Sequence, residues 1–245
     1  MSEPWFVVGR QDVGEADRIV RFLTPQRGQV DVYVRRARSS ARRYAGCFDV
    51  GNLVAVEIKE SMGRLPNLVS ADLVASPQSS RATLEGNIMV SWGCEIVAAL
   101  TAEGRDTAKL YKLLAVWIDQ LEQEGPPGAS GRLAMETKAL TFAGLTPVLT
   151  RCAITGDALD DPCGFIPDQG GAVTSVHGQR RIARRALYGL EALRRAPMAE
   201  HWSEPAPHAH AYWLMADFIE HHSGRGLRCR ALLGELMGSI HTEST

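Results

Sequence analysis

The chain has 245 residues, of which 45% are apolar and 22% charged, and its formal net charge is −1. This composition is ordinary for a globular protein and excludes a chain that is disordered over most of its length. There is no apolar run of about 18 residues or more, and the N-terminus lacks the basic start and apolar stretch of a signal peptide. We therefore expect a cytoplasmic protein that does not enter a membrane.

The charge is unevenly distributed along the chain. Residues 1–79 carry 11 basic and 9 acidic side chains, residues 80–179 carry 7 and 12, and residues 180–230 carry 9 and 5. An acidic middle therefore lies between two basic flanks, which the net charge of the whole chain conceals. Basic flanks indicate partners that are themselves anionic, such as nucleic acid or an acidic peptide.

Five segments in the first 80 residues have the composition and spacing of short β-strands. They are residues 5–8, 15–24, 28–35, 52–60 and 67–74. In the third segment, valines at positions 30, 32 and 34 alternate with polar residues, which places the valines on one face of a strand. Five short strands separated by turn residues predict a small closed barrel, of which the oligonucleotide-binding (OB) fold is one.

From about residue 79 the spacing of the apolar residues becomes helical. The first such stripe recurs every four residues, at Leu84, Ile88, Trp92, Ile96 and Leu100. Similar stripes follow at 110–121, 133–140, 186–195, 211–222 and 231–238, whereas residues 150–180 fit neither pattern. The sequence thus predicts an α+β protein with a five-stranded barrel domain at 1–79 and a helical domain at 80–245, which carries an insert at 150–180.

The strongest candidate for a binding site is a cluster of arginines just after the third strand. Five arginines fall within nine positions that contain no acidic residue, and they are Arg35, Arg36, Arg38, Arg42 and Arg43. Guanidinium groups bind phosphate oxygens with paired hydrogen bonds, and the flanking Tyr33 and Tyr44 could stack on unpaired bases. The cluster therefore favours a nucleic-acid backbone as its ligand. The alternative is a solvated loop that happens to be rich in arginine.

A second basic run begins at residue 180. Helical spacing would place Arg181, Arg184 and Arg185 on one face, where they could bind DNA or an acidic protein tail. The alternative is a solvated helix face.

The insert contains Cys152, Cys163 and His177, which are weak candidates for metal ligands. A closed structural zinc site needs four ligands, usually as two close pairs, and this set falls short of that number. The five cysteines are scattered and odd in number, so we interpret them as free thiols and expect neither a metal nor another cofactor. The chain also lacks a GxxxxGK phosphate loop, a GxSxG nucleophile elbow and an HExxH motif, so we expect that it is not an enzyme.

The order of these parts resembles the RecO family of DNA repair proteins. The family's N-terminal motifs correspond here to Arg10, Gly14, Glu15, Asp17, Leu23, Thr24 and Gly28, followed by the arginine cluster. The resemblance continues through "ETKALTFAGLTPVLTRC" at 136–152 and ends in "GLRCRALL" at 226–233. It therefore extends over nearly the full chain.

The resemblance implies an N-terminal OB barrel and a helical domain with a zinc-finger-like insert. It also implies a protein that binds single- and double-stranded DNA, anneals complementary strands, and helps RecA onto DNA coated with single-strand-binding protein. RecR and the acidic tail of single-strand-binding protein are the implied partners. The four cysteines of zinc-bearing members correspond here to Cys152, Thr155, Thr174 and His177, so the insert is degenerate in this chain.

Two functions follow from these observations. The first is a DNA-binding recombination mediator, in which the barrel arginines neutralise phosphates and allow two strands to approach each other. The alternative is a protein-interaction adaptor with little direct DNA role, whose basic helical domain binds acidic partner peptides. A metal-dependent hydrolase would be a third class, but it would require a metal.

Overall fold

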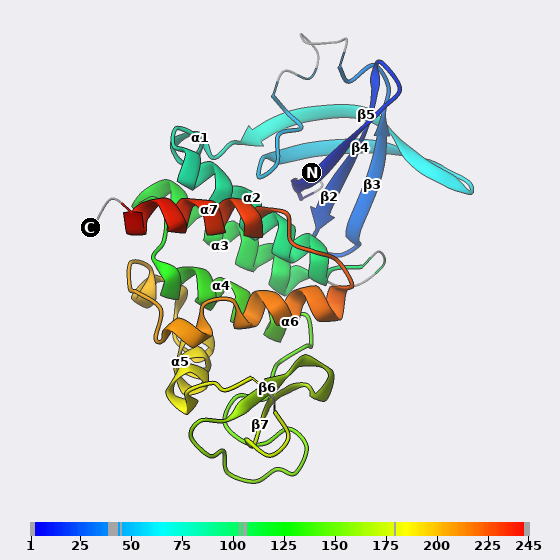
Figure 1. Cartoon of the computed structure of the whole chain (residues 1–245). Coiled ribbons are helices and arrows are strands. Elements are labelled where there is room, and N and C mark those ends of the chain that lie inside the picture. The colour runs from blue at the N-terminus through cyan, green and yellow to red at the C-terminus, as the bar shows by residue number, and fades with distance from the viewer. Residues whose placement is uncertain are drawn as a thin grey trace. The chain divides into compact units, whose positions relative to one another are not determined.

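The computed structural model describes residues 3–38, 44, 46–102, 104, 107–178 and 180–242 (Figure 1). The chain forms two compact units. The first comprises Met1–Pro126 and Arg228–Thr245, and the second comprises Pro127–Leu227. None of the helices in the described ranges combines the length and apolar character that crossing a bilayer requires.

The first unit begins with the predicted closed barrel of five strands. The strands are β1 (Trp5–Val13), β2 (Asp17–Thr24), β3 (Gly28–Val34), β4 (Leu53–Ser61) and β5 (Arg64–Ala75). They are ordered β1-β2-β3-β5-β4, and β4 closes the barrel by pairing with β1. Most neighbours are antiparallel, but β3 and β5 meet as a parallel pair at Tyr33 and Asn67. The fold predicted from the spacing of apolar residues is confirmed.

Alternation along the strands fills the inside of the barrel. Val30, Val32 and Val34 are buried, as predicted, whereas the residues between them on β3 are more exposed. Trp5 and Phe22 pack edge to face, with ring centroids 5.7 Å apart. Fully burying an aliphatic side chain such as valine stabilises a fold by about 1.5–3 kcal/mol. This core therefore stabilises the strands and fixes the positions of the residues on their outer face.

Within the described ranges, four helices complete the first unit. They are α1 (Gln78–Arg81), α2 (Leu84–Leu100), α3 (Ala108–Glu124) and α7 (Cys229–Thr242). The Tyr111 ring of α3 lies 5.0 Å from that of Phe6, between centroids, and its hydroxyl donates a 2.7 Å hydrogen bond to the Pro4 carbonyl. The Glu95 carboxylate of α2 accepts hydrogen bonds from the backbone N–H groups of Arg228 and Cys229, at 2.7 and 2.9 Å. An acidic side chain at this position caps the start of α7 and so joins it to α2.

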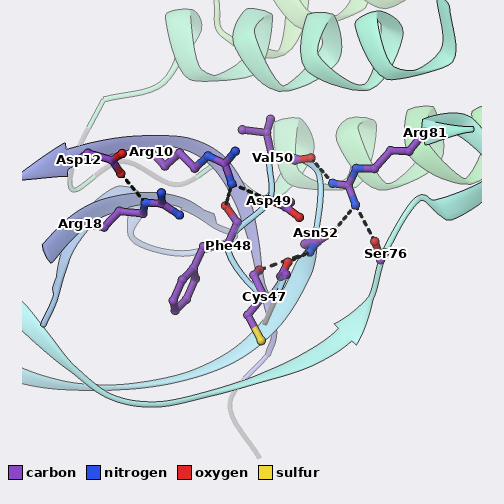
Figure 2. Close-up of polar contacts among 11 residues, drawn as sticks. Arg10, Asp12, Arg18, Cys47, Phe48, Asp49, Val50, Asn52, Ser76 and Arg81 are labelled. Atoms are coloured by element: carbon purple, nitrogen blue, oxygen red, sulfur yellow. Dashed lines mark hydrogen bonds and ion pairs between the residues drawn. The ribbon is translucent and has the colours of Figure 1, made fainter. Parts of the chain in front are cut away.

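The turn that leads into β4 is also joined to the helices, as Figure 2 shows. Arg81 donates hydrogen bonds to the Asn52 side-chain oxygen at 2.8 Å and to the Ser76 hydroxyl at 2.6 Å, and it also bonds the Val50 carbonyl. Gly51 has φ 91°, and a Cβ atom there would lie 2.4 Å from a methyl carbon of Val90. Only glycine fits this close, left-handed position.

The second unit consists of helices and the insert. Its elements are α4 (Ala129–Phe142), β6 (Gly164–Ile166), η1 (Pro167–Gln169), β7 (Gly171–Val173), α5 (Arg184–Arg195), η2 (Met198–His201), η3 (Ala209–Ala211) and α6 (Leu214–Ser223). Arg132 of α4 is buried, forms an ion pair with Glu136, and lies 4.4 Å from the ring centroid of Tyr212. A buried charge needs such partners to offset its lost hydration.

The insert is built around the two-stranded β6–β7 sheet, and its zinc-finger-like character is not shown. The structure does not bring the three weak metal candidates together. The Cys163 thiol donates to the Ile182 carbonyl at 3.4 Å, and His177 is exposed. Within the described ranges, no three histidine, cysteine, aspartate or glutamate side chains are grouped as metal ligands.

Of the four positions that correspond to zinc ligands, Thr155 and Thr174 donate hydrogen bonds to the sulfur of Cys152, whereas His177 is exposed. Burial alone would raise the pKa of Cys152, but this effect is outweighed by hydrogen bonds from the Thr155 hydroxyl and from the backbone N–H groups of Thr155, Thr174 and Ile154. Together they lower the pKa of Cys152 to about 6. Hydrogen-bond donors therefore surround this sulfur, and threonine hydroxyls are poor substitutes for the thiolates that zinc prefers. These residues do not fit a zinc ion.

We predict that Cys152 is a thiolate at neutral pH, when the other cysteines are protonated. Burial raises the pKa of Cys94 and Cys229 to about 12 and also raises those of Cys47 and Cys163. The ultraviolet thiolate absorbance of the folded protein should therefore titrate with a midpoint near the pKa of about 6 of Cys152. Cys152→Ser should abolish this step, and Thr155→Val should move it to higher pH.

The lowered pKa of Cys152 also predicts that the stability of the folded protein depends on pH. Because folding lowers the pKa of Cys152, the ionised thiolate stabilises the folded state at alkaline pH, and this contribution is lost as the pH falls through about 6. Cys152→Ser should therefore cost more stability in denaturant unfolding at pH values well above 6 than below it. Equal costs across that range would contradict the assignment.

Candidate nucleic-acid interface

A hollow of about 470 Å³ opens in the barrel wall where β3 meets β5. It is lined by two tyrosines, two cations and smaller residues, namely Tyr33, Arg35, Tyr44, Lys59, Ser61, Asn67 and Leu68. Strand pairing brings these residues together, because Asn67 of β5 pairs with Tyr33 of β3 on one side and with Lys59 of β4 on the other. Aromatic rings and cations around one concave surface can bind both parts of a nucleotide, its base and its phosphate.

The two tyrosines have different roles in this hollow. Tyr33 is half-buried, and its hydroxyl donates a hydrogen bond to Asp17, which raises the pKa of the phenol. Tyr44 is buried, and its ring packs against Phe48 with centroids 5.2 Å apart. We predicted that both rings flank the arginine cluster, but Tyr44 belongs largely to the barrel core. Tyr33 is therefore the better placed of the two to meet a base.

The carboxylate of Asp17 holds the start of the arginine cluster. Besides the Tyr33 hydroxyl, it accepts a 2.7 Å hydrogen bond from the backbone N–H of Arg36. These two bonds, the first above all, lower the pKa of Asp17. Arg36 has φ 53°, a left-handed conformation that costs a non-glycine residue about 1–2 kcal/mol. The carboxylate thus helps to hold a turn that the backbone would otherwise disfavour.

Arg38 is connected to the turn between β1 and β2. Its backbone N–H donates to the Ala16 carbonyl at 3.0 Å, and its guanidinium lies 3.5 Å from the carboxylate of Asp12. Asp12 also accepts a 2.8 Å hydrogen bond from Arg18, shown in Figure 2, and this bond is the main cause of the lowered pKa of Asp12. Arg38 nevertheless remains exposed, as do Arg35 and Arg36.

The end of the same loop is held by Arg10 of β1. Its guanidinium forms an ion pair with Asp49 and lies 3.4 Å from the Phe48 carbonyl, which it can reach as a donor (Figure 2). Arg10 and Asp17 are two of the motif residues on which the family resemblance rests. In the structure both are positioning residues for the basic loop, the connection between β3 and β4 that carries the arginine cluster. Asp17 fixes the chain where this loop begins, and Arg10 fixes it where the loop ends.

The structure places most of the predicted DNA-binding residues at one end of the barrel. Tyr33, Arg35, Arg36 and Arg38 all lie there, whereas Arg42 and Arg43 are outside the described residues. Sequence reasoning missed the contribution of the β4–β5 hairpin to the hollow. The alternating pattern did indicate that Lys59 faces away from the core, but it gave no sign that β5 would return beside β3.

The second predicted basic surface is arranged differently from the prediction. Helix α5 begins at Arg184, so Arg181 precedes the helix and the three arginines do not share one helix face. The reason is that Ile182 pairs with Cys163 of the insert, which keeps the chain extended there. Arg184 is half-buried and donates a 3.0 Å hydrogen bond to the Leu159 carbonyl, whereas Arg181 and Arg185 are exposed.

The chain is similar to known proteins over nearly its whole length. Two family models match the chain: Recombination protein O N terminal at residues 1–77, and Recombination protein O C terminal at residues 81–231. The DNA repair protein RecO of Anaeromyxobacter sp. (strain K) is 33% identical over 235 residues, which cover 92% of both chains. The RecO of Myxococcus xanthus (strain DK1622) is 31% identical over 230 residues, covering 91% of this chain and 92% of the relative. The chain therefore belongs to the RecO family, whose members act in DNA repair and recombination.

Proposed function

We propose that this protein binds single-stranded DNA across the hollow between β3 and β5, anneals complementary strands, and assists the loading of RecA onto DNA coated with single-strand-binding protein. The observation that carries the proposal is the shared lining of one hollow by Tyr33, Arg35 and Lys59. A single strand offers bases for the ring and phosphates for the two cations. The bases of a duplex are stacked and paired, so a duplex would contact only the two cations through its phosphates.

Annealing follows from charge neutralisation. Two strands repel each other through their phosphates, and a surface that neutralises part of that charge lowers the cost of bringing them together. The exposed Arg35, Arg36 and Arg38 supply this surface next to the hollow, and Arg42 and Arg43 continue the same cluster in the sequence. This activity makes and breaks no covalent bond, so it requires neither a nucleophile nor a general base, and we propose that the protein is not an enzyme.

The second unit offers a surface for an acidic peptide. Arg181 and Arg185 are exposed, and Tyr188 lies one turn further along α5 with 44% of its surface exposed. An acidic tail that ends in apolar residues would place its carboxylates against the arginines and its apolar end against the ring. We propose that the tail of single-strand-binding protein binds here and that RecR is a further partner. A protein-interaction adaptor with little direct DNA role remains the alternative that this surface would serve.

Replacing Arg35, Arg36 and Arg38 with alanine should weaken single-strand binding and flatten its dependence on salt. The slope of log affinity against log salt should fall by about 0.7 for each phosphate that the variant no longer binds. Fluorescence anisotropy of a labelled oligonucleotide across a salt series measures both quantities. Arg151→Ala, which removes an exposed arginine from the second unit, is the control. An unchanged slope in a folded triple variant would remove this cluster from the DNA-binding surface.

Two aspartates at the same end of the barrel should have opposite effects on DNA binding. Asp12→Asn removes the carboxylate that pairs with Arg18 and Arg38, so affinity for a single strand should rise. Asp17→Ala also removes a negative charge, but it releases the hydroxyl of Tyr33 and the backbone of Arg36, so affinity should fall. Tighter binding by Asp17→Ala in the same anisotropy assay would show that this residue acts through charge alone.

Arg181→Ala and Arg185→Ala should each weaken the binding of an acidic peptide by about two- to fivefold, the range of an exposed ion pair. Arg184→Ala should instead lower the thermal stability, because it removes the hydrogen bond to the Leu159 carbonyl. Calorimetric titration with a peptide that ends in acidic and then apolar residues tests the first expectation. Arg195→Ala, which changes a 72% exposed side chain elsewhere on α5, should bind like the wild type.

A further inference from the structure

The turn that joins β4 to β5 carries a fully exposed apolar side chain. Ser61 pairs with Arg64, so Met62 and Gly63 are the two central residues of the turn. Gly63 has φ 69°, which suits glycine at such a position, and Met62 has a relative exposure of 103%. In Figure 1 the tip of this hairpin, drawn in cyan, reaches away from the other strands of the barrel. Because the side chain of Met62 is fully exposed, it does not pack against β4 or β5.

The turn is continuous with the hollow described above. Lys59 and Ser61, which precede Met62, line the hollow, and so does Asn67 on the returning strand. Leu65, which lies between the turn and the hollow, is 40% exposed. A bound nucleic-acid strand that leaves the hollow along this hairpin would therefore meet Met62 next.

The charges around Met62 indicate what kind of partner it meets. Lys59 and Arg64 are both exposed, whereas the neighbouring Glu60 is paired with Arg27 at 2.8 Å. The turn thus presents an apolar side chain between two cations, and the adjacent carboxylate of Glu60 is held in an ion pair with Arg27. A single strand of nucleic acid has the complementary chemistry, because it carries apolar base faces on an anionic chain.

We propose that Met62 contacts an unpaired base of the strand that occupies the hollow, so that the β4–β5 turn extends the single-strand site beyond the barrel wall. This inference rests on the proposed function. A methionine side chain is flexible and polarisable, and its sulfur makes favourable contacts with aromatic rings. It can therefore accept any of the bases, as strand annealing without sequence preference requires. Apolar side chains such as methionine also insert at base steps in other nucleic-acid complexes.

The salt dependence of binding distinguishes this contact from a phosphate contact. Met62→Ser should weaken single-strand binding by about two- to tenfold, the range of a sulfur–aromatic contact, without changing the salt slope. Lys59→Ala should weaken binding and also reduce the slope, by about 0.7 if its side chain binds one phosphate. A reduced slope in Met62→Ser, or an affinity equal to that of the wild type, would overturn the proposal.

A fluorescent label tests the position of the contact directly. All five native cysteines are buried, but Cys152 is expected to be a thiolate at neutral pH, so Met62→Cys is made in a Cys152→Ser background, where it adds a readily labelled thiol at the turn. Val176→Cys, at a side chain 87% exposed in the second unit, is the matched control. An environment-sensitive dye at position 62 should respond to an oligonucleotide and should respond less to one with abasic sites, whereas the dye at 176 should not respond.

The outcomes separate this inference from the proposed function. If the dye at 62 is silent while Arg35→Ala weakens binding, the hollow binds DNA without the turn, and the inference on Met62 is wrong. An equal response to fully paired duplex and to single strand would also contradict it, because no unpaired base would then be involved. If neither Met62→Ser nor Arg35→Ala changes single-strand binding, the proposed function itself fails.

Discussion

The carboxylate of Asp17 joins three parts of the barrel end at which we propose that DNA binds. Asp17 begins β2, and its carboxylate accepts hydrogen bonds from the hydroxyl of Tyr33 on β3 and from the backbone N–H of Arg36 at the start of the basic loop. Neighbouring guanidinium groups repel one another and would extend a loop that nothing held. An anion at its base offsets part of this repulsion and also fixes the ring that faces the hollow. The position of Arg35, which lies between these two anchored residues, depends on this carboxylate.

The barrel in turn depends on contacts with helices that are distant in sequence. Arg81 holds the turn before β4, Tyr111 packs against Phe6 of β1, and Glu95 accepts the start of α7. Through these contacts the five strands and four helices form one compact unit, although the secondary structure changes from strand to helix near residue 77. The barrel's own buried core and these contacts with the helices supply its packing, so the wall at β3 and β5 can keep an open hollow.

The sequence predicted the helices and strands better than it predicted which of them lie side by side. Alternating valines indicated β3 and its buried face, and the change of period near residue 79 indicated the helices, because both signals are local. The hollow depends on the return of β5 beside β3, which joins residues that are far apart in the chain, so Lys59 and Asn67 were missed. Two predictions also relied on spacing where tertiary contacts decide the outcome. Tyr44 packs toward the core, and Arg181 precedes α5 because Ile182 pairs with the insert.

The acidic residues near the basic loop also bear on how DNA could be released. Asp12 forms an exposed ion pair with Arg38, and such pairs contribute only about 0–1 kcal/mol. The carboxylate of Asp12 therefore orients the guanidinium group of Arg38, yet a phosphate could replace it at little cost. Replacing the carboxylate with a phosphate also yields less binding free energy than a phosphate would gain from an arginine that has no carboxylate beside it. A surface built in this way would bind single strands without holding them firmly, as the annealing activity that we propose requires, because both strands must be released once they have paired.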